Sequence, residues 1–186
     1  MRNLGFRLTL ATLLVLAVAS VVGLAVRAEN EDQSNVFRTR LSGFGEVPPI
    51  LADGEGTFVG TLSDDGNSMD WTLDWTGLTG PALVAHIHFG PPQNTGTPVV
   101  FFCGGPKPAC PDDATHSGSI SGTWTAADIV AVPAQGVAAG DFAGFVRILR
   151  HSLGYANIHT PAHGGGEIRG QVHDRRHHER DHEDRN

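Results

Sequence analysis

Lysine is nearly absent from this sequence, because Lys107 is the only one among 186 residues. Acidic residues outnumber basic ones, with 20 Asp+Glu against 13 Lys+Arg and a formal net charge of −7 at pH 7. The first 28 residues contain three arginines and no acid, so the chain that follows them is more acidic still. A surface of this charge argues against binding to nucleic acid and against adsorption to anionic membranes.

The motifs of several large enzyme classes are also missing. The sequence has no phosphate-binding loop, no dinucleotide-binding glycine fingerprint and no nucleophile elbow. It shows no Ser-His-Asp arrangement and no paired carboxylates suited to general acid–base catalysis. Glu46 in GEVPP could suggest a general acid, but a glutamate beside a turn is usually solvated. The residues therefore predict no catalytic site.

The N-terminal segment has a basic start and then a long apolar run. Arg2 and Arg7 come first, and the small residues Val26 and Ala28 fit cleavage after Ala28. We therefore interpret residues 1–28 as a secretory signal peptide, which would place the remainder in the cell envelope or the extracellular space. The apolar run from Leu8 to Val26 is nearly long enough to span a bilayer, so an uncleaved N-terminal anchor is the alternative.

Cysteine is rare as well, with two in the whole chain, both in CGGPKPAC. An exported context favours a disulfide between Cys103 and Cys110, which would close a short loop. Its expected stabilisation is at the low end of about 2–4 kcal/mol, because a short loop restricts the unfolded chain least. No histidine lies near these cysteines to complete a zinc motif.

Glycine and proline are abundant, at 24 and 11 residues, which is typical of short strands joined by many turns. The clearest strand is SMDWTLDWTG, where Met69, Trp71, Leu73 and Trp75 alternate with polar residues and share one face. This alternation favours a core position for the tryptophans, Trp124 included, over a platform for sugar binding.

The strand-like runs together predict an all-β fold, an antiparallel β-sandwich of about eight or nine short strands. In DFAGFVRILRHS the apolar residues recur at helical spacing, so we expect a short amphipathic helix in a late crossover. Residues 29–36 are predicted to be a linker before a domain at residues 37–172. The tail at residues 173–186 is charged and rich in histidine, and is predicted to be disordered.

Two histidines stand either side of an isoleucine in AHIHFG, at residues 85–90. In a strand, His86 and His88 point to the same face, roughly 6.5–7 Å apart along the strand. Two later strands have a similar polar face opposite an apolar one, in YANIHT and GEIRGQV. If the three strands are neighbours, one patch collects seven polar side chains: His86, His88, Asn157, His159, Glu167, Arg169 and Gln171.

The motifs GFGEVPP, AHIHFG, YANIHT and GGEIRGQV, in this order, resemble the CHRD domain, which is repeated in chordin and occurs singly in many microbial exported proteins. The resemblance covers residues 37–172. It implies an extracellular module of the β-sandwich type. Chordin binds growth factors, but for single-domain microbial members the resemblance implies no established activity.

One hypothesis for the patch is a metal site. His86, His88 and His159 would supply three imidazoles, with His163 or Glu167 as a fourth ligand, a donor set that suits zinc or copper(II). Asn157 or Gln171 could orient a ring by bonding its second nitrogen. The alternative is a polar network in which the histidines bond to Glu167 and to loop backbones and bind nothing.

A third reading is an enzyme, because HIHFGPPQNTG is similar to the copper-ligand strand of Cu/Zn superoxide dismutase, itself a sandwich. The next histidine after His88 is His116, however, so the closely spaced ligands of that family's zinc loop are missing. We therefore expect a binding or structural module of the cell envelope or extracellular space, with the histidine patch as its site. Its partner would be an extracellular protein or a glycan of unknown identity.

Overall fold

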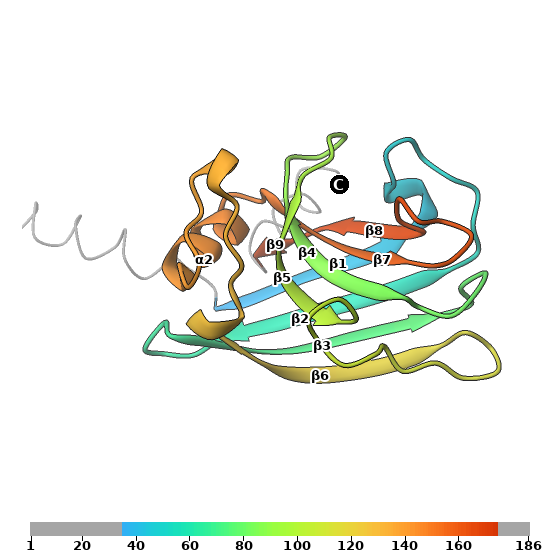
Figure 1. Ribbon diagram of the computed structural model, residues 1–186, viewed down its shortest axis with the longest axis horizontal. Helices are drawn as coiled ribbons and strands as arrows, with labels where there is room; N and C mark the ends of the chain where they lie inside the picture. Colours follow the sequence, from blue (N-terminus) through green and yellow to red (C-terminus); the bar gives the residue numbers. More distant parts are fainter. Residues whose placement is uncertain (1–34, 175–186) are drawn as a thin grey trace, which may run out of the picture. The chain divides into compact units, whose positions relative to one another are not determined.

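Nine strands and one short α-helix form the regular structure of residues 35–174, the part of the chain that the computed structural model describes (Figure 1). In chain order the elements are β1 (Val36–Ser42), η1 (Gly43–Gly45), β2 (Glu55–Leu62), β3 (Ser68–Thr76), β4 (Val84–Phe89), β5 (Thr97–Cys103), β6 (Gly118–Thr125), η2 (Ala126–Asp128), η3 (Pro133–Gln135), α2 (Phe142–Arg150), β7 (Gly154–His159), β8 (Ile168–Gln171) and β9 (His173–Asp174).

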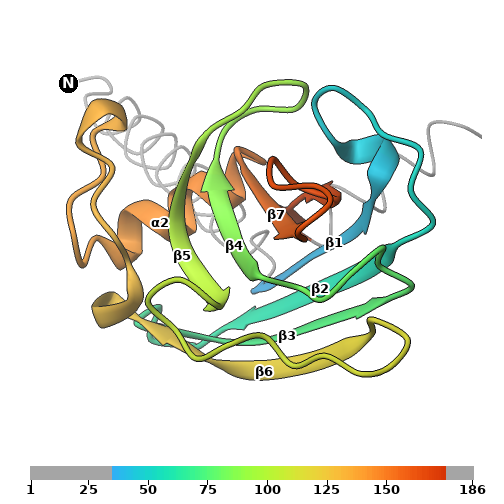
Figure 2. The ribbon, with the colours of Figure 1, turned by 45° about the vertical axis from the view of Figure 1, so that its right-hand side comes forward.

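The strands belong to one continuous antiparallel sheet in the order β5-β4-β7-β8-β1-β2-β3-β6, with β9 paired to β1. The sheet curls so that its β5-β4-β7 part faces its β2-β3-β6 part across the core (Figure 2). This sandwich-like, nearly closed arrangement confirms the prediction of an all-β antiparallel fold with a short helix in a late crossover.

Strand β3 shows how the alternating pattern becomes structure. Met69, Trp71, Leu73 and Trp75 are buried, while the residues between them are exposed or half-buried on the other face. Trp124 from the neighbouring β6 stacks on Trp71, with ring centroids 5.0 Å apart. All three tryptophans are therefore core residues, as the alternation predicts.

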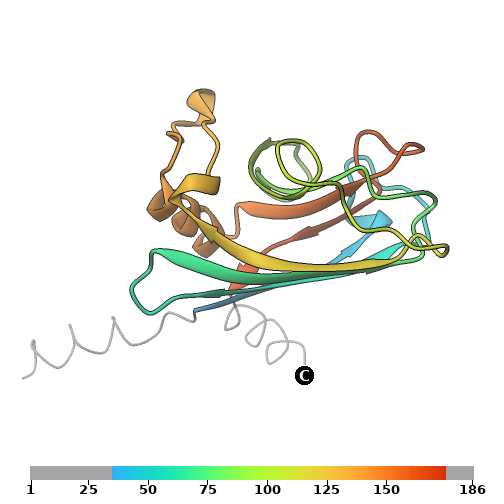
Figure 3. The same cartoon turned by 60° about the horizontal axis from the view of Figure 1, so that its bottom comes forward.

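Helix α2 lies at one end of the strands (Figure 3). Asp141 caps its N-terminus by accepting a hydrogen bond from the Gly144 N–H at 2.8 Å. The predicted apolar face is buried, and Phe145 packs edge-on against Trp124 at 5.7 Å between centroids. Within residues 35–174, no helix is both long enough and apolar enough to cross a bilayer.

Cys103 and Cys110 form the predicted disulfide, which closes a loop directly after β5. The domain boundaries differ slightly from the predicted ones. Val36, assigned to the linker, is the first residue of β1, and the predicted tail starts too early because His173–Asp174 pairs with β1 as β9. The proposed signal peptide, the rest of the linker and the rest of the tail lie outside the described residues.

Candidate metal centre

The three strands that carry the polar motifs are neighbours, in the order β4-β7-β8. In register, His86 lies opposite Asn157, which lies opposite Arg169, and His88 lies opposite Tyr155. Directly opposed residues of antiparallel strands share a face. The apolar face of these strands packs into the core, while the polar face is covered by loops, so both faces are buried.

His86, His88 and His159 converge on this face. Ring centroids are 4.3 Å apart for His86 and His88, 4.7 Å for His86 and His159, and 6.1 Å for His88 and His159. One ring nitrogen from each residue lies within 4.8 Å of the other two. Nitrogens bound to one tetrahedral zinc lie about 3.4 Å apart, so modest ring rotations would bring these three to a shared ion.

Backbone carbonyls orient two of the rings. His88 Nδ1 lies 2.8 Å from Gly96 O, and His159 Nδ1 lies 3.0 Å from Gly164 O. A carbonyl accepts only from a protonated nitrogen, so each ring carries its proton on Nδ1 and keeps a lone pair on Nε2. Both Nε2 atoms are buried without a hydrogen-bond partner, and so is His86 Nδ1. A histidine that ligates a metal typically donates its other N–H in this way.

Burial keeps the three imidazoles neutral. It lowers the pKa of His86 to about 2, with a further contribution from the neighbouring His88 and His159. It lowers the pKa of His88 to about 4 and also lowers that of His159. Neutral imidazole is the form that binds metal, so the rings are ready as ligands at neutral pH without having to release a proton.

Gly96 fixes both His88 and its neighbour Tyr155. Its carbonyl accepts from His88, and its N–H donates to Tyr155 Oη at 3.0 Å. The Tyr155 ring stacks on His88 with centroids 4.5 Å apart and an interplanar angle of 8°. A Cβ on Gly96 would lie 2.0 Å from Phe89 O, so only glycine allows this close approach.

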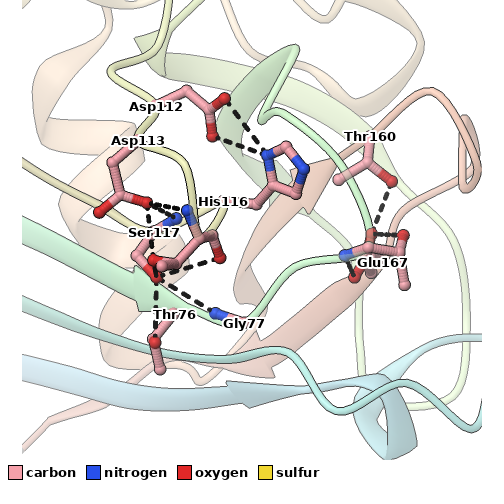
Figure 4. A network of polar contacts seen from close by, with 10 residues as sticks. Thr76, Gly77, Asp112, Asp113, His116, Ser117, Thr160 and Glu167 are labelled. Carbon is pink, nitrogen blue, oxygen red and sulfur yellow. Dashed lines mark hydrogen bonds and ion pairs between the residues drawn. The ribbon is translucent and has the colours of Figure 1, made fainter.

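The predicted fourth ligands are not available at the cluster. His163 lies in the turn after β7, where its backbone N–H donates to Thr160 O. Within residues 35–174, the group of histidines that could share a metal ion consists of His86, His88 and His159, without His163. Glu167 is fully buried and accepts from Thr79 N–H, Thr79 Oγ1 and Thr160 Oγ1 at 2.6–2.7 Å (Figure 4). Both of its oxygens are therefore used in tying two loops together.

Asn157 orients no histidine ring. Its Nδ2 donates to Ile168 O at 2.9 Å and to Glu46 Oε1 at 2.7 Å. Glu46 is only 7 % exposed, so the expectation of a solvated side chain is wrong. Burial raises the pKa of Glu46 to about 7, against the opposing effects of Asn157 and Arg169.

The last two predicted members of the patch bond mainly to loop backbone. Arg169 donates from Nη2 to Pro91 O at 3.1 Å, and its guanidinium lies over the Tyr155 ring, 3.5 Å from the centroid. Gln171 Nε2 reaches three carbonyls at 2.7–3.1 Å. The polar network therefore exists, but the described contacts show no histidine ring bonded to Glu167 or Asn157.

Local sequence patterns could not have placed Glu46, Gly96 or Gly164. Glu46 contacts a strand that is distant in the sequence, while Gly96 and Gly164 come from the loops that follow β4 and β7 and fold back over them. His116, the next histidine after the strand, lies in a separate exposed loop, where its Nδ1 is 3.3 Å from both carboxylate oxygens of Asp112 (Figure 4). It supplies no fourth imidazole to the cluster.

A family model described as the CHRD domain matches residues 37–172 of the chain. The match includes all three histidines of the cluster and both cysteines of the disulfide. Comparison with curated proteins and with solved structures found no match.

Proposed function

The chain belongs to the CHRD family, which indicates a fold more than an activity. From the site, we propose that the protein is an exported binding module that holds one zinc or copper ion at His86, His88 and His159. The observation that carries the proposal is the convergence of three rings, with one nitrogen of each within 4.8 Å of the others, in a place where His86 Nδ1, His88 Nε2 and His159 Nε2 are buried without a hydrogen-bond partner. A buried polar atom without a partner destabilises a fold, and a metal ion would satisfy all three at once.

Three neutral imidazoles leave one coordination position open. This donor set suits zinc, which binds three protein ligands and an exchangeable fourth group, and it also suits copper(II). The open position, which lies under the loops, would take one small donor such as water. Tyr155, stacked on His88, would restrict how that ring turns.

Export is part of the proposal. The disulfide between Cys103 and Cys110 supports it, since such bonds persist in oxidising compartments. Cleavage of residues 1–28 would release the module, whereas an uncleaved segment would leave it anchored. Nothing in the arrangement favours superoxide dismutation, because a fourth imidazole is missing from the described cluster.

Metal analysis of the untagged protein tests the site. The chain is best ended after Asp174, which removes the later tail histidines and keeps β9 in place. We expect one zinc or copper ion per molecule and a metal-dependent rise in the free energy of unfolding, about 2.7 kcal/mol at a free metal concentration of about 100 times Kd. His88→Ala should abolish both effects.

His163→Ala is the matched control, since His163 lies just beyond the cluster and should leave stoichiometry and affinity unchanged. If His88→Ala binds metal as well as the unaltered protein, or if chelator has no effect on the stability of either, the metal site is refuted. A stability loss in His88→Ala that is equal with and without metal would indicate a structural latch instead.

A further inference from the structure

A cavity of about 440 Å³ lies beside the histidine cluster, between the loop after β1 and the loop after β4. The two loops rise next to one another from the sheet (Figures 1 and 2). Apolar side chains line its walls: Phe44, Val47, Pro49 and Pro92. Its volume falls within the roughly 300–1,000 Å³ of small-molecule sites, which combine apolar walls with a few polar groups.

The polar groups of this cavity include Arg169 and Glu46. Arg169 is 3 % exposed, and within residues 35–174 no ion pair joins it to an acid. Arginine is rarely buried to this extent without an anionic partner, because an unpaired buried charge is costly. Its one hydrogen bond in the described structure goes to Pro91 O, and the Tyr155 ring lies against its guanidinium, but no anion lies beside it.

Glu46 does not take the place of that partner. Its Oε1 accepts from Asn157, and it lies outside ion-pair distance of Arg169. Burial raises the pKa of Glu46 to about 7, so near neutral pH the carboxyl is only partly ionised. The cavity therefore combines a buried guanidinium with apolar side chains, of which Phe44 is exposed.

We propose that this cavity binds a small organic carboxylate, with its carboxylate on the Arg169 guanidinium and its apolar body against Phe44, Pro49 and Pro92. A planar guanidinium matches a carboxylate with two parallel N–H···O bonds. Phe44 is 70 % exposed, which is unusual for so large an apolar side chain and is explained if a ligand covers it. The site is separate from the histidine cluster, because the Tyr155 ring lies between Arg169 and His88.

Calorimetric titration of the full chain with benzoate tests the proposal. Chelator is present throughout, so that the outcome does not depend on whether the histidines bind metal. We expect saturable binding at one site with Kd of about 1 mM or tighter. Benzamide, which has the same ring but no charge, should bind at least about tenfold more weakly. The proposal would be overturned if benzoate showed no saturable binding, or if benzoate and benzamide bound with equal affinity.

Two substitutions locate the bound molecule. Phe44→Ala should weaken benzoate binding about five- to tenfold without unfolding the protein, since the side chain is mostly exposed. Arg169→Lys keeps the charge but loses the paired donors, and should weaken binding at least about tenfold. Arg40→Gln, at an exposed arginine of β1, is the control and should change nothing. If Phe44→Ala and Arg40→Gln bind benzoate equally, the cavity is not the site.

Discussion

Strands β3 and β7 have similar alternating sequences but different surroundings. The polar residues of β3 face solvent, where Asp70 and Asp74 are exposed. The polar residues of β7 are covered by loops, so that Tyr155 and Asn157 are as buried as the apolar residues between them. The polar face of an alternating strand is therefore not always exposed to solvent, because loops from other parts of the chain can cover it.

The difference matters for energetics. A polar group on the exposed face of β3 bonds to water in both the unfolded and the folded chain, so folding changes its free energy little. A polar group under the loops must find a protein partner, and most here do. Three histidine nitrogens and Gln171 Oε1 are buried without a partner, and the grouping of the three nitrogens makes this covered face the candidate site.

The largest expected effect comes from Glu167→Ala. It leaves Thr79 N–H and two threonine hydroxyls without their acceptor in a buried position. We expect a loss of at least about 3 kcal/mol in the free energy of unfolding, measured by urea denaturation. Asp74→Ala on β3 is the control and should stay within about 0.5 kcal/mol. Similar losses for both would mean that the covered and exposed faces do not differ.

Gly96→Ala should have the next largest effect. The added Cβ would displace the backbone from Phe89 O and move the carbonyl that orients His88. We expect a stability loss of about 2 kcal/mol and a 10–100-fold loss of metal affinity, measured by competition with a chelating dye. Gly165→Ala, where an added Cβ meets open space, should change neither. Unaltered affinity in Gly96→Ala would show that ring orientation by Gly96 is unimportant.

The last predicted effect is a pH dependence of stability that comes from Glu46. Its pKa rises from 4.5 in the unfolded chain to about 7 in the folded protein, so the folded state binds the extra proton. The resulting stabilisation is complete below pH 4.5 and is lost as the pH rises through about 7. The buried histidines, with lowered pKa values, act in the opposite sense, since their contribution is lost as the pH falls below 6.5.

Glu46→Gln separates these effects, because the histidines titrate alike in both proteins. The stability of the unaltered protein minus that of Glu46→Gln should fall by on the order of 2 kcal/mol between pH 4.5 and 7 and be flat outside this window. Urea denaturation at a series of pH values, with chelator present, gives the difference. If the stability difference between the two proteins does not change with pH, the pKa of Glu46 is the same in the folded and unfolded chain, as expected for a solvated side chain.

The sequence predicted those features that depend on local pattern. Alternation in β3 and in YANIHT identified which residues share a face, and helical spacing identified α2. The grouping of His86, His88 and His159 also requires β4 and β7 to be neighbours. Alternation along a strand does not specify this, because it does not say which strand lies beside it.

What the sequence did not predict depends on loops. Whether Glu46 is buried is decided by the fold of the η1 segment against β7, and whether His163 joins the cluster is decided by the turn after β7. Neither leaves a periodic signal. Gly96 is one of 24 glycines, and nothing in its local context marks it as the residue that holds His88.

The position of β5 at an end of the sheet has a consequence for association between molecules. A strand in this position normally presents free backbone groups on which another chain can add as a further strand. Here the carbonyl of Phe101 accepts from the Trp124 indole and that of Val99 from Val130 N–H, while Pro98 has no N–H to offer. An incoming strand thus meets an interrupted row of donors and acceptors at this end of the sheet, which disfavours edge-to-edge association through β5.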